Sequence, residues 1–222
     1  MYKTLCLVLL FVMTGSLYAD KKFTIKGIYQ PDTQFNFNTS GTLAGGIKDE
    51  SDGSYDVEGG FGLGAEISAY SNDRLEILGG VNYILTRKID RLSLTETLSY
   101  GGQAVSGRYE GPVADDSKLD VTSLYVKPRY FLEKPSADNV AIYIAGSLSY
   151  NLVSIKIGNA GNVKAKDGFG FGLSAGIVVN DLIDLEAAYN IAVGDFLLSD
   201  ETNDWKGTYN LPTLSLAAGL RF

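Results

Sequence analysis

The sequence predicts an all-β protein, an eight-stranded antiparallel up-and-down transmembrane β-barrel, on three observations. Residues 211–222 alternate between apolar and small or polar side chains, which is the period of a strand with one apolar face. Seven further segments show the same alternation. After the first twenty residues, no stretch approaches the roughly 18 consecutive apolar residues of a spanning helix, so a membrane-spanning fold must use strands.

The composition supports this class and excludes others. The 222 residues include 26 glycines, 14 tyrosines and five prolines, and the net charge is −7. This acidic balance argues against nucleic-acid binding. There is no histidine, and Cys6 is the only cysteine. We therefore expect no cofactor and no metal site built on histidine or cysteine.

The first residues are typical of an export signal. Lys3 supplies a positive charge, residues 5–12 form a short apolar core, and 17–19 offer a cleavage site before Asp20. We expect a signal peptide at 1–19 and the barrel at 20–222.

The order of strands and connections matches a transmembrane barrel. The strands are expected at about 23–29 with a continuation to 37, 56–70, 74–87, 119–132, 140–154, 167–179, 182–196 and 211–222. The connections alternate between short turns at 71–73, 133–139 and 180–181 and long polar loops at 38–55, 90–118, 157–166 and 198–208. Short turns at one end and long loops at the other are typical of outer-membrane barrels. The alternation continues through 92–100, which predicts a hairpin above the membrane whose edges could pair with partner strands.

The two strand faces indicate which side is outside. The polar face is rich in Gly, Ala and Ser, as at 60–64 and 168–172. Such small residues suit a crowded barrel interior, whereas the bulky Leu, Ile, Phe and Tyr residues suit lipid. The alternative is a lipocalin-like barrel in water, with its apolar face inward.

Charged residues on the small-residue face predict a cluster in the lumen. Its members are Lys26, Glu58, Glu66, Glu76, Lys127, Arg129, Asp184, Glu186 and Arg221. An eight-stranded barrel has room only for its own side chains, and buried charges must be paired. We expect a plug that fixes register, although an ion or proton pathway is an alternative that no residue pattern selects.

Hairpin registers predict three pairings within this cluster. Glu76 is expected near Arg129, Lys26 near Glu66, and Asp184 near Arg221. The paired carboxylates Asp184 and Glu186 could do acid–base chemistry, but with cations available they favour a salt-bridge cluster. No catalytic residue is expected.

Two connections carry candidate features. The acidic segment 49–56 lacks the spacing of a calcium loop and is expected to be a solvated turn. Trp205, the only tryptophan, lies in the expected loop 198–208. It is a candidate loop contact, either as a binding anchor or as an interfacial belt residue.

The terminal strand with its last residue, Phe222, resembles the closing strand of bacterial outer-membrane β-barrels, where a terminal Phe belongs to the insertion signal. Residues 20–222 resemble the small barrel family of opacity-protein-like surface antigens, outer-membrane protein X and the barrel of outer-membrane protein A. The resemblance implies a location in the bacterial outer membrane. The implied partners are outer-membrane lipid and lipopolysaccharide, the barrel-insertion machinery, and a host or cell-surface ligand at the loops.

The resemblance also implies a function. We expect a non-enzymatic surface protein, a surface antigen with an envelope-structural or adhesion role. The alternative is a narrow porin-like channel or transporter of small or hydrophobic solutes. The known small-barrel enzymes rely on a histidine, which this chain lacks.

Overall fold

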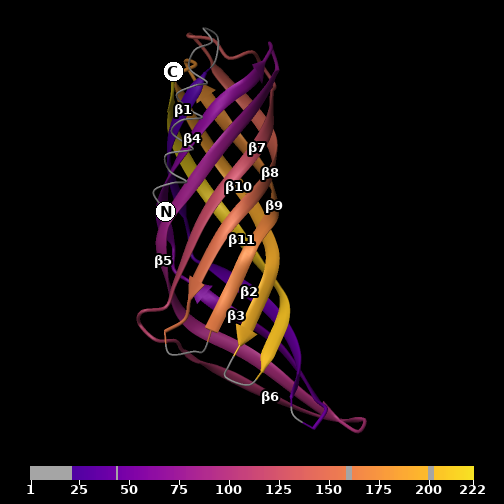
Figure 1. The fold of residues 1–222 in the computed structure, drawn as a ribbon. Coiled ribbons are helices and arrows are strands. Elements are labelled where there is room, and N and C mark those ends of the chain that lie inside the picture. Colours follow the sequence, from indigo (N-terminus) through magenta and orange to yellow (C-terminus); the bar gives the residue numbers. More distant parts are fainter. Residues whose placement is uncertain (1–21, 44, 159–161, 200–202) are drawn as a thin grey trace.

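The computed structural model describes residues 22–43, 45–158, 162–199 and 203–222, so the predicted signal peptide lies outside the described residues. Within them, no helix is long and apolar enough to cross a membrane. The elements, shown in Figure 1, are β1 (Phe23–Gln30), β2 (Thr33–Leu43), β3 (Ile47–Val57), β4 (Gly60–Ser71), β5 (Leu75–Tyr100), β6 (Gln103–Pro112), β7 (Lys118–Phe131), β8 (Val140–Lys156), β9 (Asn162–Val179), β10 (Ile183–Ser199) and β11 (Asp204–Arg221).

Eight strands close into a ring by antiparallel pairing. The order around the wall is β1, β4, β5, β7, β8, β9, β10, β11 and back to β1. The amide N of Phe23 donates to the carbonyl O of Phe222 at 2.9 Å, and the amide N of Phe222 donates to Phe23 O at 2.8 Å. The predicted eight-stranded antiparallel barrel is confirmed, and the terminal strand β11 closes it.

Short turns gather at the end of the barrel that carries Phe222, here called the inner end (upper end in Figure 1). Between β9 and β10, Asn180 and Asp181 have φ angles of 53° and 54°, as a type I′ hairpin turn requires. Between β4 and β5, the side-chain Oδ1 of Asn72 accepts the amide of Leu75 at 2.7 Å. The predicted turns at 71–73 and 180–181 are therefore present, because Asn and Asp tolerate these conformations.

The outer end is built from strands where long loops were predicted. β2 pairs with β3 and β11, and β3 pairs with β5. β6 folds back on the outer part of β5. The predicted loop at 38–55 was therefore wrong for most of its length, and β9 and β11 likewise begin inside the expected loops at 157–166 and 198–208. Within the connection 90–118, the hairpin predicted from the alternation through 92–100 is present, formed by the outer part of β5 and by β6. Polar composition suggested loops, but pairing with the neighbouring strand decides the structure.

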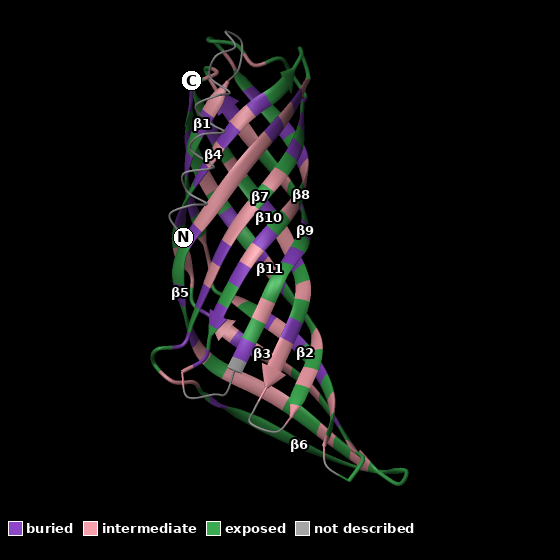
Figure 2. Ribbon diagram, in the orientation of Figure 1, coloured by how far each residue is buried: buried purple, intermediate pink, exposed green. Residues whose placement is uncertain are grey.

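The wall strands reverse their polarity between the two ends. Along β11 the odd-numbered side chains face inward throughout. Toward the inner end these are small or charged, as at Ser215, whereas the outward ones are leucines, as at Leu216. Beyond Pro212 the inward residues become large, as at Tyr209, and the outward ones polar, as at Thr208. The alternation is visible along the strands in Figure 2.

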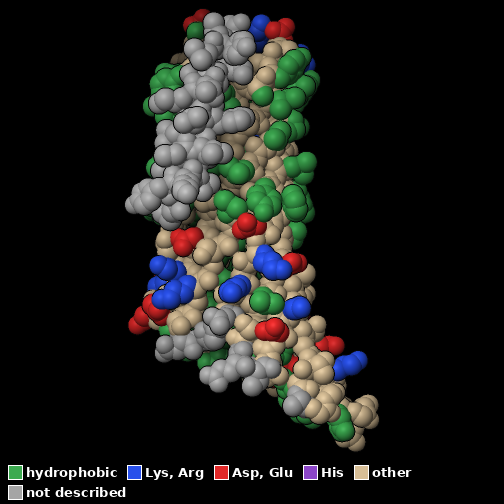
Figure 3. All heavy atoms as spheres, viewed as in Figure 1, with side chains coloured by type: hydrophobic (Ala, Val, Ile, Leu, Met, Phe, Trp, Pro, Cys, Tyr) green, Lys and Arg blue, Asp and Glu red, His purple; other side chains and the backbone are tan. Residues whose placement is uncertain are grey.

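This reversal marks the boundary of an apolar exterior band. Outward-facing leucines, isoleucines and aromatics around the inner half are exposed, and Figure 3 shows them as a green belt. Blue and red side chains follow directly below it in that view, and toward the outer end exposed ion pairs such as Lys156–Asp116 and Lys166–Asp195 link neighbouring strands and connections. An apolar belt bounded by charge is the exterior of a membrane-spanning barrel.

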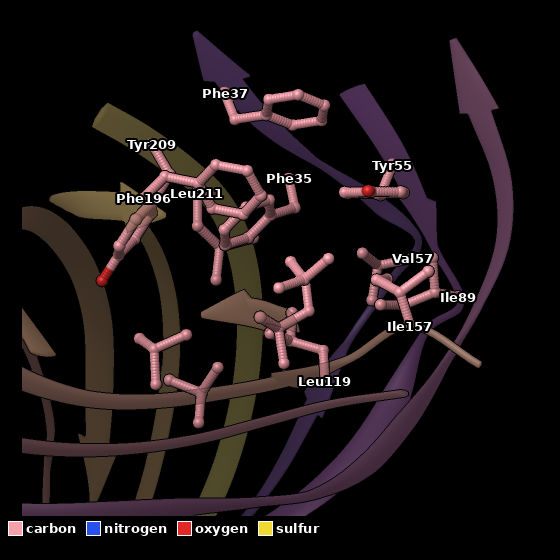
Figure 4. Close-up of a cluster of buried hydrophobic side chains, with 14 of the residues drawn as sticks. Phe35, Phe37, Tyr55, Val57, Ile89, Leu119, Ile157, Phe196, Tyr209 and Leu211 are labelled. Carbon is pink, nitrogen blue, oxygen red and sulfur yellow. The ribbon is translucent and has the colours of Figure 1, made fainter. Parts of the chain in front are cut away.

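The outer half of the barrel is closed by a packed apolar core. Its centre is a group of aromatic rings, including a stacked pair of Phe35 and Tyr209 with centroids 4.9 Å apart and a stacked pair of Phe37 and Phe196 at 4.7 Å. Figure 4 shows these side chains converging from several strands. Beyond the apolar exterior band, toward the outer end, the wall faces water, so burying apolar surface inward becomes favourable there.

Candidate functional site

The inner half of the lumen holds a network of charged residues. Six strands supply its members on their inward faces, which are Lys26, Glu66, Glu76, Lys127, Arg129, Asp184, Glu186 and Arg221. Because inward positions recur every second residue, β7 contributes two cations and β10 two carboxylates. Four cations thus face four carboxylates, and the network is balanced in charge.

Glu66 and Glu186 lie at the centre of the network. Lys26 Nζ lies 2.9 Å from a carboxylate oxygen of each. Lys127 pairs with Glu66 and, at 2.7 Å, with Glu186. Such shared contacts between buried charges are needed to offset the cost of removing them from water.

Two arginines complete the network toward the inner end. Arg129 Nη2 lies 2.8 Å from Asp184 Oδ2, and Arg129 Nη1 lies 3.6 Å from Glu76 Oε2. Arg221 donates two hydrogen bonds to Glu76, at 2.8 and 3.1 Å. Its Nε also lies 3.2 Å from Asp181 at the rim. The fork-to-fork geometry of Arg221 and Glu76 is the strongest arrangement for such a pair.

Two tyrosines also belong to the network and were missed by sequence reasoning. The Tyr125 hydroxyl donates to Glu66 at 2.9 Å, and the Tyr143 hydroxyl lies 2.7 Å from Asp184 and 2.9 Å from Glu186. The Tyr143 ring also lies under the Arg129 guanidinium, 4.0 Å from centroid to Cζ. The signal was available, because Tyr125 shares strand parity with Lys127 and Arg129 of β7, and Tyr143 shares it with small inward residues of β8 such as Ala145 and Ser147.

Glycines make room for these two rings. A Cβ on Gly80 would lie 2.5 Å from Cζ of Tyr125, and a Cβ on Gly176 would lie 2.4 Å from the Tyr143 hydroxyl. The glycine-rich inward faces therefore have a packing reason, since only a residue without Cβ allows an aromatic ring to lie on the wall.

The predicted pairings are present in two of three cases. Lys26 contacts Glu66 and Arg129 contacts Glu76. The predicted pairing of Asp184 with Arg221 was wrong, because Asp184 contacts Arg129 and Lys26. Glu58 was also wrongly placed in the lumen. It is exposed at the break between β3 and β4, where the change of strand shifts its side chain out of the inward row.

The two other residues predicted to have a function, Phe222 and Trp205, lie outside the charged network. Phe222 is exposed at the inner rim beside Phe23. Trp205 lies in β11, half-buried and packed toward Gly41, and its indole Nε1 donates to Asp49 at 2.7 Å. Trp205 is therefore not on a loop, and the segment 49–56 is strand β3 rather than a solvated turn. Their functional roles remain predictions.

A small cavity separates the charged network from the apolar core. Its volume is about 80 Å³, which is room for several water molecules. Hydroxyl and amide side chains line its sides, among them Asn82, Ser123, Asn151 and Asn190. Arg87 lies at its outer end, where Val121 and Leu211 of the apolar core also line it.

Comparisons with known proteins identify the fold. No family model matches the sequence, and no curated protein matches it. Among solved structures, the outer membrane protein OprG from Pseudomonas aeruginosa is 12% identical, with a TM-score of 0.55 over 90% of this chain and 95% of that chain. This chain has the outer-membrane β-barrel fold. The fold agrees with the apolar exterior band and with the predicted bacterial outer-membrane location. Neisserial surface protein A (NspA) also matches, at 15% identity and a TM-score of 0.40 over 90% of this chain and 97% of that chain.

Proposed function

We propose that this protein is a non-enzymatic outer-membrane surface barrel whose outer sheet binds a strand of a partner polypeptide, in an adhesion or other cell-surface contact. The observation that carries the proposal is the edge strand β6. Among the described residues β6 pairs only with β5, so one side of its backbone is free. An exposed strand edge is a template for adding a strand from another chain.

The side chains of β6 favour a protein partner. Val105 is 74% exposed and Tyr109 is 54% exposed, and they lie on the same face of the strand. Tyr100, at the end of β5, extends this apolar surface. Tyrosine and other large apolar groups supply much of the binding energy at protein interfaces. The hairpin of β5 and β6 stands beyond the apolar exterior band, in the region that water reaches, as seen at the lower end of Figure 1.

The closed lumen supports contact rather than passage. The charged network fills the inner half and the aromatic core fills the outer half. We expect purified protein in planar bilayers to give no steady single-channel openings. Steady openings would favour the alternative, a narrow channel or transporter of small solutes.

The proposal is tested by adhesion of bacteria that carry the protein. We expect each of the single variants Val105→Lys and Tyr109→Lys to lower adhesion of the bacteria, to each other and to host-cell layers, to the level of a deletion strain. The matched control is Ser154→Lys, which places the same charge on an exposed position of β8 and should leave adhesion unchanged. Wild-type adhesion by the β6 variants, with folded protein shown by heat-modifiable migration on SDS gels, would contradict the proposal.

A further inference from the structure

Arg87 is a buried cation without a partner among the residues that the structure describes. It is only 2% exposed, and its Nε, Nη1 and Nη2 atoms make no hydrogen bond to any of them. No carboxylate of the described residues lies within ion-pair distance of it. The four cations of the charged network already balance its four carboxylates, so that network has no spare counter-ion for Arg87. An unpaired buried charge is costly unless something neutralises it.

The fold directs this side chain into the lumen cavity. The ladder between β5 and β7 is irregular between Ile84 and Arg87, and Arg87 is inward while its neighbours Thr86 and Lys88 are exposed. Its methylene groups pass over Gly60, where a Cβ would lie 2.8 Å from Arg87 Cγ. The guanidinium therefore lies at the outer end of the cavity, next to the apolar core.

A second unsatisfied group lies beside it. Gln30 pairs with Gly60 across the β1–β4 ladder and lines the same cavity, and its buried Oε1 atom has no hydrogen bond to any described residue. The oxygen and nitrogen of an amide are interchangeable by a flip, so Gln30 can turn its NH₂ toward a bound acceptor. Hydroxyl and amide groups on the cavity sides, such as Ser123 and Asn190, offer further donors.

We propose that Arg87 and this cavity form a binding site for one small anion, of the size of a halide ion or an acetate. The anion would accept hydrogen bonds from the Arg87 guanidinium and from the Gln30 amide. The cavity volume of about 80 Å³ excludes large solutes. This site is independent of the proposed contact at β6, because the two lie in different parts of the molecule.

Bromide is the direct probe, because its anomalous scattering locates it in crystals of the full chain grown in sodium bromide. We expect a peak in the lumen within hydrogen-bonding distance of Arg87. The peak should be absent in Arg87→Met and retained in the control Arg91→Met, which removes an exposed cation of the same strand. An empty lumen in the wild type, or a peak that persists in Arg87→Met, would overturn the proposal.

Stability in solution provides a second readout that needs no crystals. At constant ionic strength, replacing gluconate, which is too large for the cavity, by chloride or acetate should raise the unfolding midpoint of the wild type. Arg87→Met should lose this dependence, and Arg87→Lys should keep it with roughly tenfold to a hundredfold weaker affinity. Equal midpoints of the wild type in all three salts would contradict the site.

The bromide crystals also distinguish two sources of the anion, by competition with a second anion. If acetate or butanoate displaces bromide from the lumen, the site accepts the carboxylate of a small organic solute. If only chloride competes, the site holds an inorganic ion. Either result supports an anion site at Arg87, whereas competition by neither would contradict it.

Discussion

Arg221 and Glu76 form a two-point ion pair across the lumen, with Nη2–Oε1 at 2.8 Å and Nη1–Oε2 at 3.1 Å. They are 145 residues apart in the chain and belong to β11 and β5. Neither strand pairs directly with the other, so the contact crosses the barrel interior. The pair therefore ties the last strand to β5, which is separated from it in the wall by β1 and β4, close to the inner rim.

Breaking this pair should destabilise the barrel. Arg221→Met leaves Glu76 buried with only the longer contact to Arg129, and we expect a loss of about 3–5 kcal/mol in the free energy of unfolding. Urea unfolding in lipid vesicles, followed by the heat-modifiable gel shift, measures it. The double variant Glu76→Met with Arg221→Met removes both charges and should cost less than Arg221→Met alone. An equal or larger cost for the double variant would show that charge imbalance is not the cause.

Two neighbouring glycines should respond differently to alanine. Gly80 faces the Tyr125 ring, whereas nothing lies within 4 Å of a Cβ on Gly79. Gly80→Ala should lower the free energy of unfolding by roughly 1–3 kcal/mol, because Tyr125 must move from Glu66. Gly79→Ala should be neutral or stabilising by about 0.5–1 kcal/mol. The same vesicle assay compares them, and equal effects would argue against a packing role for Gly80.

The free-energy cost of a charge on the outward face of β11 should show where the lipid-facing band ends. Leu216 and Thr208 are both outward and exposed, but Leu216 lies in the apolar band and Thr208 beyond it. Leu216→Arg should cost about 2–4 kcal/mol of folding free energy in lipid and Thr208→Arg about 0–1 kcal/mol. Folding yields into vesicles test this, and a similar cost at both positions would contradict the boundary near Pro212.

One turn at the inner end should show a shifted acid titration. Lys134, in the β7–β8 turn, donates a hydrogen bond from its Nζ to Asp73 in the β4–β5 turn at 2.6 Å and lowers the pKa of that carboxyl. The folded pKa lies below the unfolded one, so the pair contributes stability above the ordinary Asp pKa of about 3.9 and loses it as pH falls through the lowered value. NMR titration of Asp73 should give a depressed pKa in the wild type. Lys134→Met should return it toward normal, and an unchanged value would exclude Lys134 as the cause.

Much of the barrel could be predicted because period-two alternation is a local property. The wall strands β5 and β7 to β11, the hairpin turn at Asn180–Asp181, and the inward direction of eight of the nine charges follow from the parity of each strand. The alternation through 92–100 predicted the hairpin that β6 completes, whereas the outer strands β2 and β3 could not be separated from polar loops. Their outward faces meet water, and the apolar alternation that marks a lipid-facing strand is absent or reversed there.

The terminal strand shows what the sequence determines and what depends on the tertiary structure. By itself, the sequence determined that 211–222 is a strand with leucines on one face and Arg221 on the other, because side chains alternate along any strand. Only the tertiary structure decided that Arg221 meets Glu76 rather than Asp184, and that Arg87 has no partner within the described part of the chain. Partners across a lumen depend on the stagger of the whole ring of strands and on the reach of each side chain, and no local pattern encodes either.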